Sequence, residues 1–134
     1  MAVTPFRIAV PDADVDALTA ALGRTRWPDQ IDGAGWDYGT ELGYLQELVG
    51  YWADGFDWRA QEQWLNRFDH RVAGVDGLRI HFVHHRADGG RVPLVLTHGW
   101  PSTFVELLSL VDRLGDRFDL VVPSLPGYGF SQRP

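Results

Sequence analysis

The spacing of apolar residues predicts three helices in the first half of the chain. The first is expected to begin at Asp12, whose carboxylate can accept hydrogen bonds from the free amides of the first turn, and to end at Gly23. Thr40 is the expected cap of the second helix and Asp57 of the third, which runs to about Asn66. Their inner faces consist of Val15, Leu18 and Leu22; of Leu42, Leu45, Leu48 or Val49, and Trp52; and of Trp58, Gln61, Trp64 and Leu65. Tyr44 and Tyr51 widen the apolar face of the second helix, and a helix this aromatic is expected to be covered by protein on more than one side.

A loop is expected between the first two helices, over residues 25–39. This segment contains proline, glycine and acidic turn formers together with Trp27 and Trp36. Large aromatic rings in a loop are usually buried. We therefore expect both tryptophans to anchor the loop against the body of the protein, in preference to stacking on a ligand.

Alternation of apolar and polar residues predicts a hairpin in the second half. Residues 72–75 and 78–85 are the expected strands, and Asp76-Gly77 between them is a favoured two-residue hairpin turn. The second strand is expected to bury one face and to leave the other partly exposed to solvent. The buried face would consist of Leu78, Ile80 and Phe82, and the partly exposed face of Arg79, His81 and Val83.

A strand, a helix and a second strand follow the hairpin. Residues 92–97 are an apolar run, residues 104–114 have apolar positions at helical spacing, and Gly115 is placed to end that helix. Residues 119–122 form the second apolar run. Because strand–helix–strand connections are right-handed, these two strands are expected to be parallel, and the fold class to be α/β. Residues 123–130 would then form a loop beside the end of the first strand.

The turn His98-Gly99-Trp100-Pro101 follows the first parallel strand and precedes the helix. Ligands of open α/β sheets bind outside the carboxyl ends of the strands. A tight turn at that place directs backbone N–H groups outward, which suits the binding of an oxyanion. The sequence therefore predicts a candidate site at this turn.

The turn, together with Pro123-Ser124-Leu125-Pro126-Gly127-Tyr128-Gly129-Phe130-Ser131, resembles the α/β-hydrolase fold, specifically epoxide hydrolases of the microsomal type. The resemblance extends over nearly the whole chain, because the segment before the sheet is similar to the N-terminal extension of that family. The matching motifs are Arg26-Trp27-Pro28-Asp29, Trp36-Asp37-Tyr38-Gly39, Tyr51-Trp52, Phe56-Asp57-Trp58-Arg59 and Leu65-Asn66-Arg67-Phe68. The chain departs from the family at Phe68-Asp69-His70-Arg71. The resemblance implies a helical extension over residues 1–70 and the incomplete start of a hydrolase core over residues 71–134.

The family opens an epoxide with an aspartate at a nucleophile elbow, two tyrosines and a histidine paired with an acid. None of these residues has a counterpart here, and the chain has no Gly-x-Asp/Ser-x-Gly pattern. The resemblance implies that the Trp100 backbone N–H supplies half of an oxyanion hole, and that the Trp100 ring lines the epoxide pocket or packs in the core. Pro101 would fix the turn through a cis Trp100–Pro101 bond. Gly99 would support the turn, and His98 would be structural.

Composition and charge exclude several classes of function. The net charge of −6 argues against nucleic-acid binding, and the absence of cysteine excludes a disulfide or a cysteine nucleophile. His81, His84 and His85 are expected on a partly exposed strand edge, so neither a metal nor another cofactor is predicted. Residues 1–10 lack the features of a signal peptide, and no stretch approaches the roughly 20 apolar residues of a membrane span. We therefore expect a cytoplasmic protein without membrane contact.

Three functions compete. The favoured one is the N-terminal part of an epoxide hydrolase that acts on a hydrophobic epoxide, is inactive alone, and self-associates or pairs with a missing C-terminal part. The alternative is a non-catalytic module that binds a hydrophobic ligand or another protein. A third possibility, an esterase or dehalogenase with the same turn, is disfavoured because the tryptophan-rich extension is typical of the epoxide hydrolases.

Overall fold

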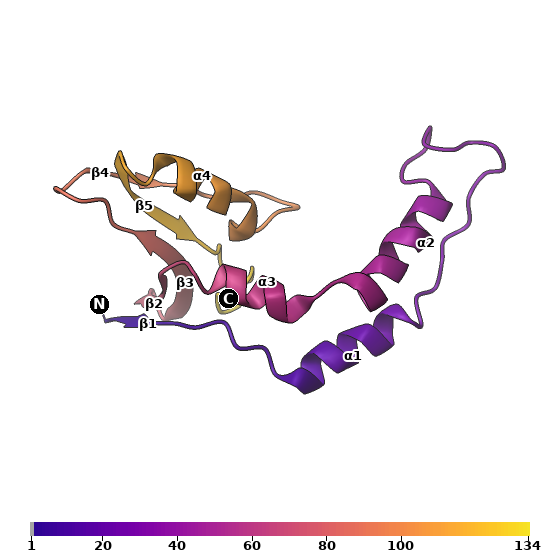
Figure 1. Cartoon of the computed structure of the whole chain (residues 1–134), viewed down its shortest axis with the longest axis horizontal. Helices are drawn as coiled ribbons and strands as arrows, with labels where there is room; N and C mark the ends of the chain where they lie inside the picture. The colour runs from indigo at the N-terminus through magenta and orange to yellow at the C-terminus, as the bar shows by residue number, and fades with distance from the viewer. Residues whose placement is uncertain (1) are drawn as a thin grey trace. The chain divides into compact units, whose positions relative to one another are not determined.

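A computed structural model describes residues 2–134 (Figure 1). The chain divides into two compact units, one made of Met1–Ile8 and Gln63–Pro134 and the other of Ala9–Glu62. No helix within residues 2–134 has the length and the apolar character that crossing a membrane requires. The elements are β1 (Val3–Pro5), α1 (Asp12–Leu22), α2 (Leu42–Gly50), the π-helix η1 (Tyr51–Gly55), α3 (Trp58–Leu65), β2 (His70–Val75), β3 (Leu78–His85), β4 (Val92–Val95), the 3₁₀ helix η2 (Phe104–Leu107), α4 (Leu108–Leu114) and β5 (Phe118–Pro123).

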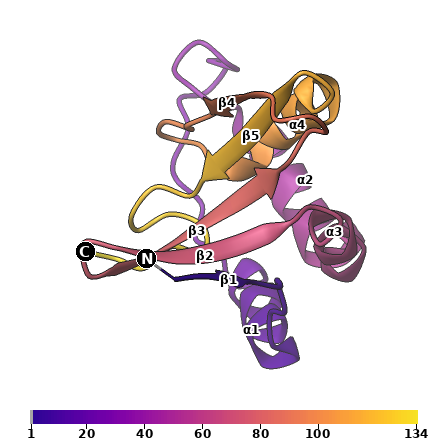
Figure 2. The same cartoon turned by 90° about the vertical axis from the view of Figure 1, so that its left-hand side faces the viewer.

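A mixed sheet forms the centre of the first unit. Over the described residues it has five strands in the order β1-β2-β3-β5-β4. β4 and β5 are parallel, and all other neighbouring strands are antiparallel (Figure 2). The strand–helix–strand pattern predicted this parallel pair, and the alternation predicted the β2–β3 hairpin. The predicted α/β class is therefore confirmed.

The turn of the hairpin has the backbone that its sequence requires. Asp76 has φ of 49° and Gly77 has φ of 82°. Two consecutive positive φ angles define the type I′ turn, whose twist matches that of the paired strands. Glycine adopts this conformation without strain, and aspartate tolerates it better than most residues do. This local signal was sufficient to fix the register of the hairpin.

The predicted inner face of β3 is wrong. His81 and Val83 are the fully buried residues of this strand, whereas Leu78, Ile80 and Phe82 are only half-buried. In the described chain, η2 covers the His81 face, where the Phe104 ring lies 5.0 Å from the His81 ring. The prediction treated histidine as a solvent-facing residue. A neutral, fully hydrogen-bonded imidazole can instead be buried at little cost.

Two of the three predicted helix caps are wrong. Asp12 is the first residue of α1 and caps nothing, because Pro11 occupies the N-cap position without a side-chain hydrogen bond. The cap of α2 is Glu41, not Thr40, and its carboxylate accepts hydrogen bonds from the amides of residues 43 and 44. These bonds lower the pKa of Glu41. The cap of α3 is Asp57, as predicted, with Oδ1 2.9 Å from the Ala60 nitrogen.

The unit Ala9–Glu62 buries little of its own apolar surface. None of the residues of α1, α2 or η1 is fully buried. Trp36 is exposed and lies against Tyr44, and Trp27 is also exposed, so neither ring is buried as expected within residues 2–134. An apolar groove of about 610 Å³ lies between α1 and the α2–η1 segment. Leu18, Leu22, Leu48, Trp52, Phe56 and Trp58 line it.

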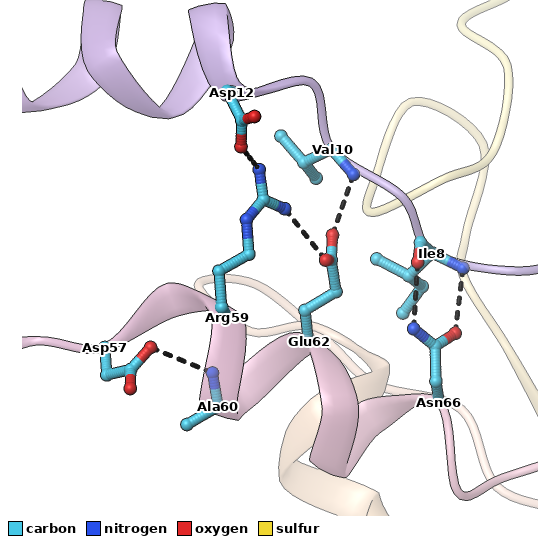
Figure 3. Close-up of polar contacts among 8 residues, drawn as sticks. All are labelled: Ile8, Val10, Asp12, Asp57, Arg59, Ala60, Glu62 and Asn66. Atoms are coloured by element: carbon cyan, nitrogen blue, oxygen red, sulfur yellow. Dashed lines mark hydrogen bonds and ion pairs between the residues drawn. The ribbon is translucent and has the colours of Figure 1, made fainter.

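Polar side chains of α3 and of the residue after it hold the segment that precedes α1 (Figure 3). Asn66 Oδ1 accepts from the Ile8 N–H at 2.9 Å, and Asn66 Nδ2 donates to the Ile8 carbonyl at 2.8 Å. Glu62 accepts from the Val10 N–H at 2.7 Å, and this bond is the main cause of the lowered pKa of Glu62. Arg59 bridges Glu62, at 2.8 Å, and Asp12. Side-chain bonds thus replace a strand partner for this segment.

The core of the sheet unit contains a chain of hydrogen bonds through two histidines. The Ser124 hydroxyl donates to His81 Nδ1 at 2.9 Å, His81 Nε2 donates to His70 Nδ1 at 2.9 Å, and His70 Nε2 donates to the Leu65 carbonyl at 2.8 Å. His70, His81 and Ser124 are at most 2% exposed. Burial lowers the pKa of both histidines, so both imidazoles are neutral. Because a carbonyl only accepts, the Leu65 oxygen then determines the direction of every donor in the chain.

We predict that Asn66→Ala lowers the free energy of unfolding by about 2 kcal/mol. The N–H and the carbonyl of Ile8, a buried residue, would both lose their hydrogen-bond partner. Urea unfolding of the purified protein measures the change. Gln63→Ala is the matched control, since Gln63 is exposed and lies in the last turn of α3, three residues before Asn66. A loss no greater for Asn66→Ala than for this control would contradict the role of Asn66.

We also predict that acid destabilises the protein through His81. Burial, with a smaller effect of the neighbouring His70, lowers the pKa of His81 to about 3. An unfolded histidine has a pKa near 6.5, so below that pH the unfolded chain binds a proton that the folded chain does not. The contribution of His81 to the free energy of unfolding is fully present above about pH 6.5. It falls by about 1.4 kcal/mol per pH unit as the pH decreases from about 6.5 towards 3.

The measurement is urea unfolding at several pH values between 7.5 and 4.5. His81→Gln removes the buried titrating group and should flatten the dependence on pH. His84→Gln is the control, because His84 is half-buried on the same strand and its side chain takes no part in the hydrogen-bond chain. An acid dependence that is equally steep in His81→Gln and in the wild type would show that His81 is not its source.

Candidate functional site

The candidate site begins where β4 ends. The predicted strand over residues 92–97 is shorter in the structure, Val92–Val95, although the Leu96 N–H still donates to the Val121 carbonyl of β5 at 2.9 Å. The chain then leaves the sheet and turns through residues 98–103 into η2, where Thr103 caps the first turn. The predicted helix over residues 104–114 thus begins as a 3₁₀ turn and continues as α4. The strand–turn–helix arrangement is present as expected.

His98 is buried and joins the turn to the loop after β5. Its Nδ1 donates to the Gly99 carbonyl at 3.0 Å, and its Nε2 accepts from the Leu125 N–H at 3.1 Å. The ring also packs edge-on against Tyr128, with the ring centroids 5.1 Å apart. These contacts use both ring nitrogens, so neither is free to act as a base. The two hydrogen bonds of His98 thus join the turn to the loop after β5.

Trp100 and Pro101 form the outer part of the turn. The Trp100–Pro101 peptide bond is cis, as the resemblance implied. The Trp100 side chain is 82% exposed, so its ring does not pack in the core of the described chain. Within residues 2–134 no hydrogen bond uses the Trp100 N–H. Gly99 and Pro101 are also exposed. The turn thus presents an unused backbone donor beyond the carboxyl end of β4.

The loop after β5, residues 124–131, forms the other side of the site. Its two glycines have positive φ, 83° at Gly127 and 50° at Gly129. At Gly129 glycine is also required by packing, because a Cβ atom there would lie 2.7 Å from Ser124 Oγ and 3.4 Å from Phe104. Ser131 Oγ donates to the Ser124 carbonyl at 2.7 Å and closes the loop. The loop is therefore compact and held from inside the sheet unit.

His70, His81 and Ser124 form the part of the site region that sequence reasoning missed. The hydrogen-bond chain of these three residues ends directly beside Leu125, the donor to His98. The alternation of β3 assigned His81 to a partly exposed face, and nothing local connects it with Ser124, 43 positions away. The only available signal was an unusual number of histidines in two paired strands.

The described residues provide neither a nucleophile elbow nor a metal-binding group at this turn. The sequence lacks a nucleophile elbow, and among residues 2–134 no group of three histidine or acidic side chains could hold a metal ion. What the arrangement offers chemically is a fixed backbone N–H that can stabilise negative charge.

Comparison with known proteins identifies the family. The pattern of the family described as "Epoxide hydrolase N terminus" matches residues 3–107. A putative epoxide hydrolase of Stigmatella aurantiaca is 43% identical, over 98% of this chain and 32% of that protein. Epoxide hydrolase 1 of Sus scrofa is 32% identical, over 97% of this chain and 32% of its own length. The chain therefore spans about a third of the curated relatives that it matches.

Solved structures of epoxide hydrolases are similar in fold to this chain. The epoxide hydrolase of Aspergillus niger superposes with a TM-score of 0.87 at 34% identity, covering 100% of this chain and 38% of that one. The juvenile hormone epoxide hydrolase of the silkworm Bombyx mori gives a TM-score of 0.86 at 31% identity, covering 98% and 38%. The family pattern and the shared fold lead to one conclusion: this chain belongs to the microsomal-type epoxide hydrolases, in which it corresponds to the N-terminal region.

Proposed function

We propose that this chain is the N-terminal part of an enzyme that hydrolyses a hydrophobic epoxide to a vicinal diol. In this mechanism an aspartate from a later part of the enzyme attacks an epoxide carbon, the carbon–oxygen bond of the ring breaks, and an aspartyl ester forms. Water then attacks the ester carbonyl, and the resulting oxyanion accepts a hydrogen bond from the Trp100 N–H. The second donor would follow the nucleophile in the sequence.

The observation that carries this proposal is the unused Trp100 N–H on a turn that His98 fixes. A preorganised donor acts without reorganisation when charge develops, and one such donor is typically worth roughly 2.7–4 kcal/mol of transition-state stabilisation. His98 provides the preorganisation, because its bonds to the Gly99 carbonyl and the Leu125 N–H tie the turn to the adjacent loop. The turn contributes to the second step, hydrolysis of the ester. It cannot replace the nucleophile or the base.

A second candidate function rests on the groove between α1 and the α2–η1 segment. Its volume of about 610 Å³ and its apolar lining would suit a non-catalytic module that binds a hydrophobic ligand. The nucleotide sequence after the codon for Pro134 distinguishes the two functions. A Gly-x-Asp-x-Gly elbow followed by tyrosines and a histidine, in any frame, would support the hydrolase. Their absence would exclude this catalytic mechanism and favour the binding module.

We predict that residues 1–134 alone open no epoxide above background, because the nucleophile and the base are missing. Turnover of a styrene-oxide-type substrate by chain freed of contaminating hydrolases measures this. Enzymatic turnover in that preparation would contradict the proposal. Heat-treated chain is the control for the uncatalysed reaction.

In the full-length enzyme, Trp100→Ala distinguishes the role of the backbone N–H from the role of the indole ring. The variant keeps the backbone N–H and removes an exposed indole. If the ring contacts the bound epoxide, as we propose, KM rises by about tenfold and kcat changes less, because binding common to the ground state and the transition state is lost. Steady-state kinetics measures both constants. An unchanged KM would contradict the proposed contact of the ring with the epoxide.

The chain alone is further predicted to self-associate or to fold poorly. Tyr51 and Trp52 of η1 and Leu48 of α2 are exposed, and the outer residues of β4, Val92 and Val95, are exposed as well. Exposed apolar surface and an unpaired strand edge promote association. Light scattering and thermal unfolding measure the outcome. A compact monomer with a cooperative melt would contradict this prediction.

A further inference from the structure

The hydrogen-bond chain through His70 and His81 ends on Ser124, the first residue of the loop that holds His98. Every polar group of Ser124 is used there. Its hydroxyl donates to His81 Nδ1, its N–H donates to the His81 carbonyl at 2.9 Å, and its carbonyl accepts from Ser131 Oγ. Ser131 Oγ in turn accepts from the His81 N–H at 2.9 Å. His81 and the first and last parts of the loop are therefore joined by four hydrogen bonds.

These bonds lie in apolar surroundings. The rings of Phe6, Phe104 and Phe130 lie 5.0 to 5.3 Å from the His81 ring, and no water-exposed surface remains on His81 or Ser124. In such a place a polar group that loses its partner cannot turn to solvent. The loop therefore has one favourable placement, in which the Ser124 hydroxyl faces His81.

The placement of Ser124 also determines the placement of Leu125. The Leu125 N–H is the partner of His98 Nε2, and His98 Nδ1 donates to the Gly99 carbonyl, which belongs to the same peptide group as the Trp100 N–H. Hydrogen bonds thus connect the Leu65 carbonyl with Ser124, and the peptide bond from Ser124 to Leu125 continues the connection to His98 and to the turn that carries the oxyanion donor. An apolar side chain in place of His81 would fill the same volume but would not fix the direction of any donor.

We propose that His70, His81 and Ser124 are positioning residues for the oxyanion turn, acting through Leu125 and His98. The catalytic consequence rests on the proposed function. None of the three touches the reacting atoms. Their role is to keep the loop over residues 124–131 in the one conformation that directs the Leu125 N–H at His98.

The test uses Ser124→Ala in the full-length protein, with Ser109→Ala as the matched control on the exposed side of α4. Hydrogen–deuterium exchange of the loop amides is expected to become roughly tenfold faster in Ser124→Ala, because His81 Nδ1 is left without a donor. The hairpin of β2 and β3 should remain protected. An unchanged loop, or equally faster exchange in the hairpin, would overturn the proposal, since Ser124 would then have no effect on the loop or only a general one on the fold.

The kinetic readout separates positioning from general stability. Ser124→Ala should lower kcat by roughly tenfold at unchanged KM, because an oxyanion donor acts in the transition state and not in substrate binding. A rise in KM at constant kcat would overturn the proposal. If the wild-type enzyme has no epoxide hydrolase activity, the proposed function fails. The exchange measurement still decides whether these residues position the loop.

A measurement on the wild-type protein covers the case in which Ser124→Ala does not fold. Nitrogen-15 NMR of the histidine rings reports which nitrogen carries the proton. The structure requires neutral rings protonated on Nε2 at His70 and His81 and on Nδ1 at His98. The opposite tautomer at His81, or a charged ring at pH 7, would overturn the proposal.

Discussion

The parallel pairing of β4 and β5 is the constraint on which the candidate site depends. Because both strands end at the same edge of the sheet, the turn after β4 and the loop after β5 leave the sheet side by side. His98 can then reach the Leu125 N–H, 27 positions further along the chain. An antiparallel arrangement would place the turn and the loop at opposite ends. The helical connection through η2 and α4 makes the parallel arrangement possible.

The interior of the sheet unit is specified by the directions of its hydrogen bonds as well as by apolar packing. Leu108, Val111, Leu120 and Val122 form an ordinary apolar core. Apolar packing tolerates alternative side-chain arrangements more readily than a chain of hydrogen bonds does, because each donor needs a correctly directed acceptor. The two buried histidines thus favour a single conformation at the point where the loop over residues 124–131 joins the sheet. Neutral imidazoles provide it without the cost of a buried charge.

The unit Ala9–Glu62 presents the opposite case. Local polar bonds are present there: Glu41 caps α2 by accepting from its first amides, and Glu62 accepts from the Val10 N–H. Yet no residue of α1 or α2 is buried within the described chain. Local interactions are therefore sufficient to place helices, whereas burial of their apolar faces needs more protein. The relatives, of which this chain spans about a third, are long enough to supply it.

The sequence by itself determined the elements whose signals are local. Asp76-Gly77 specified a type I′ hairpin, Asp57 capped α3, and the spacing of the following segments specified a parallel pair with His98-Gly99-Trp100-Pro101 at its end. Tertiary structure alone decided which face of β3 is inside. His81 is buried because it finds partners at His70 and Ser124, and no pattern of neighbouring residues reveals partners that are distant in the sequence.

Partners that are distant in the sequence also decide the roles of Gly115 and Asp12. Gly115 ends α4 as expected, with φ of −58°, but the sequence did not reveal the contact that requires glycine there, since a Cβ atom would lie 2.5 Å from His85 Nε2. Asp12 had the residue type of a cap, but its carboxylate pairs with Arg59, 47 positions away. A residue type restricts what a position can do. Which of those roles it performs depends on the atoms that the fold brings next to it.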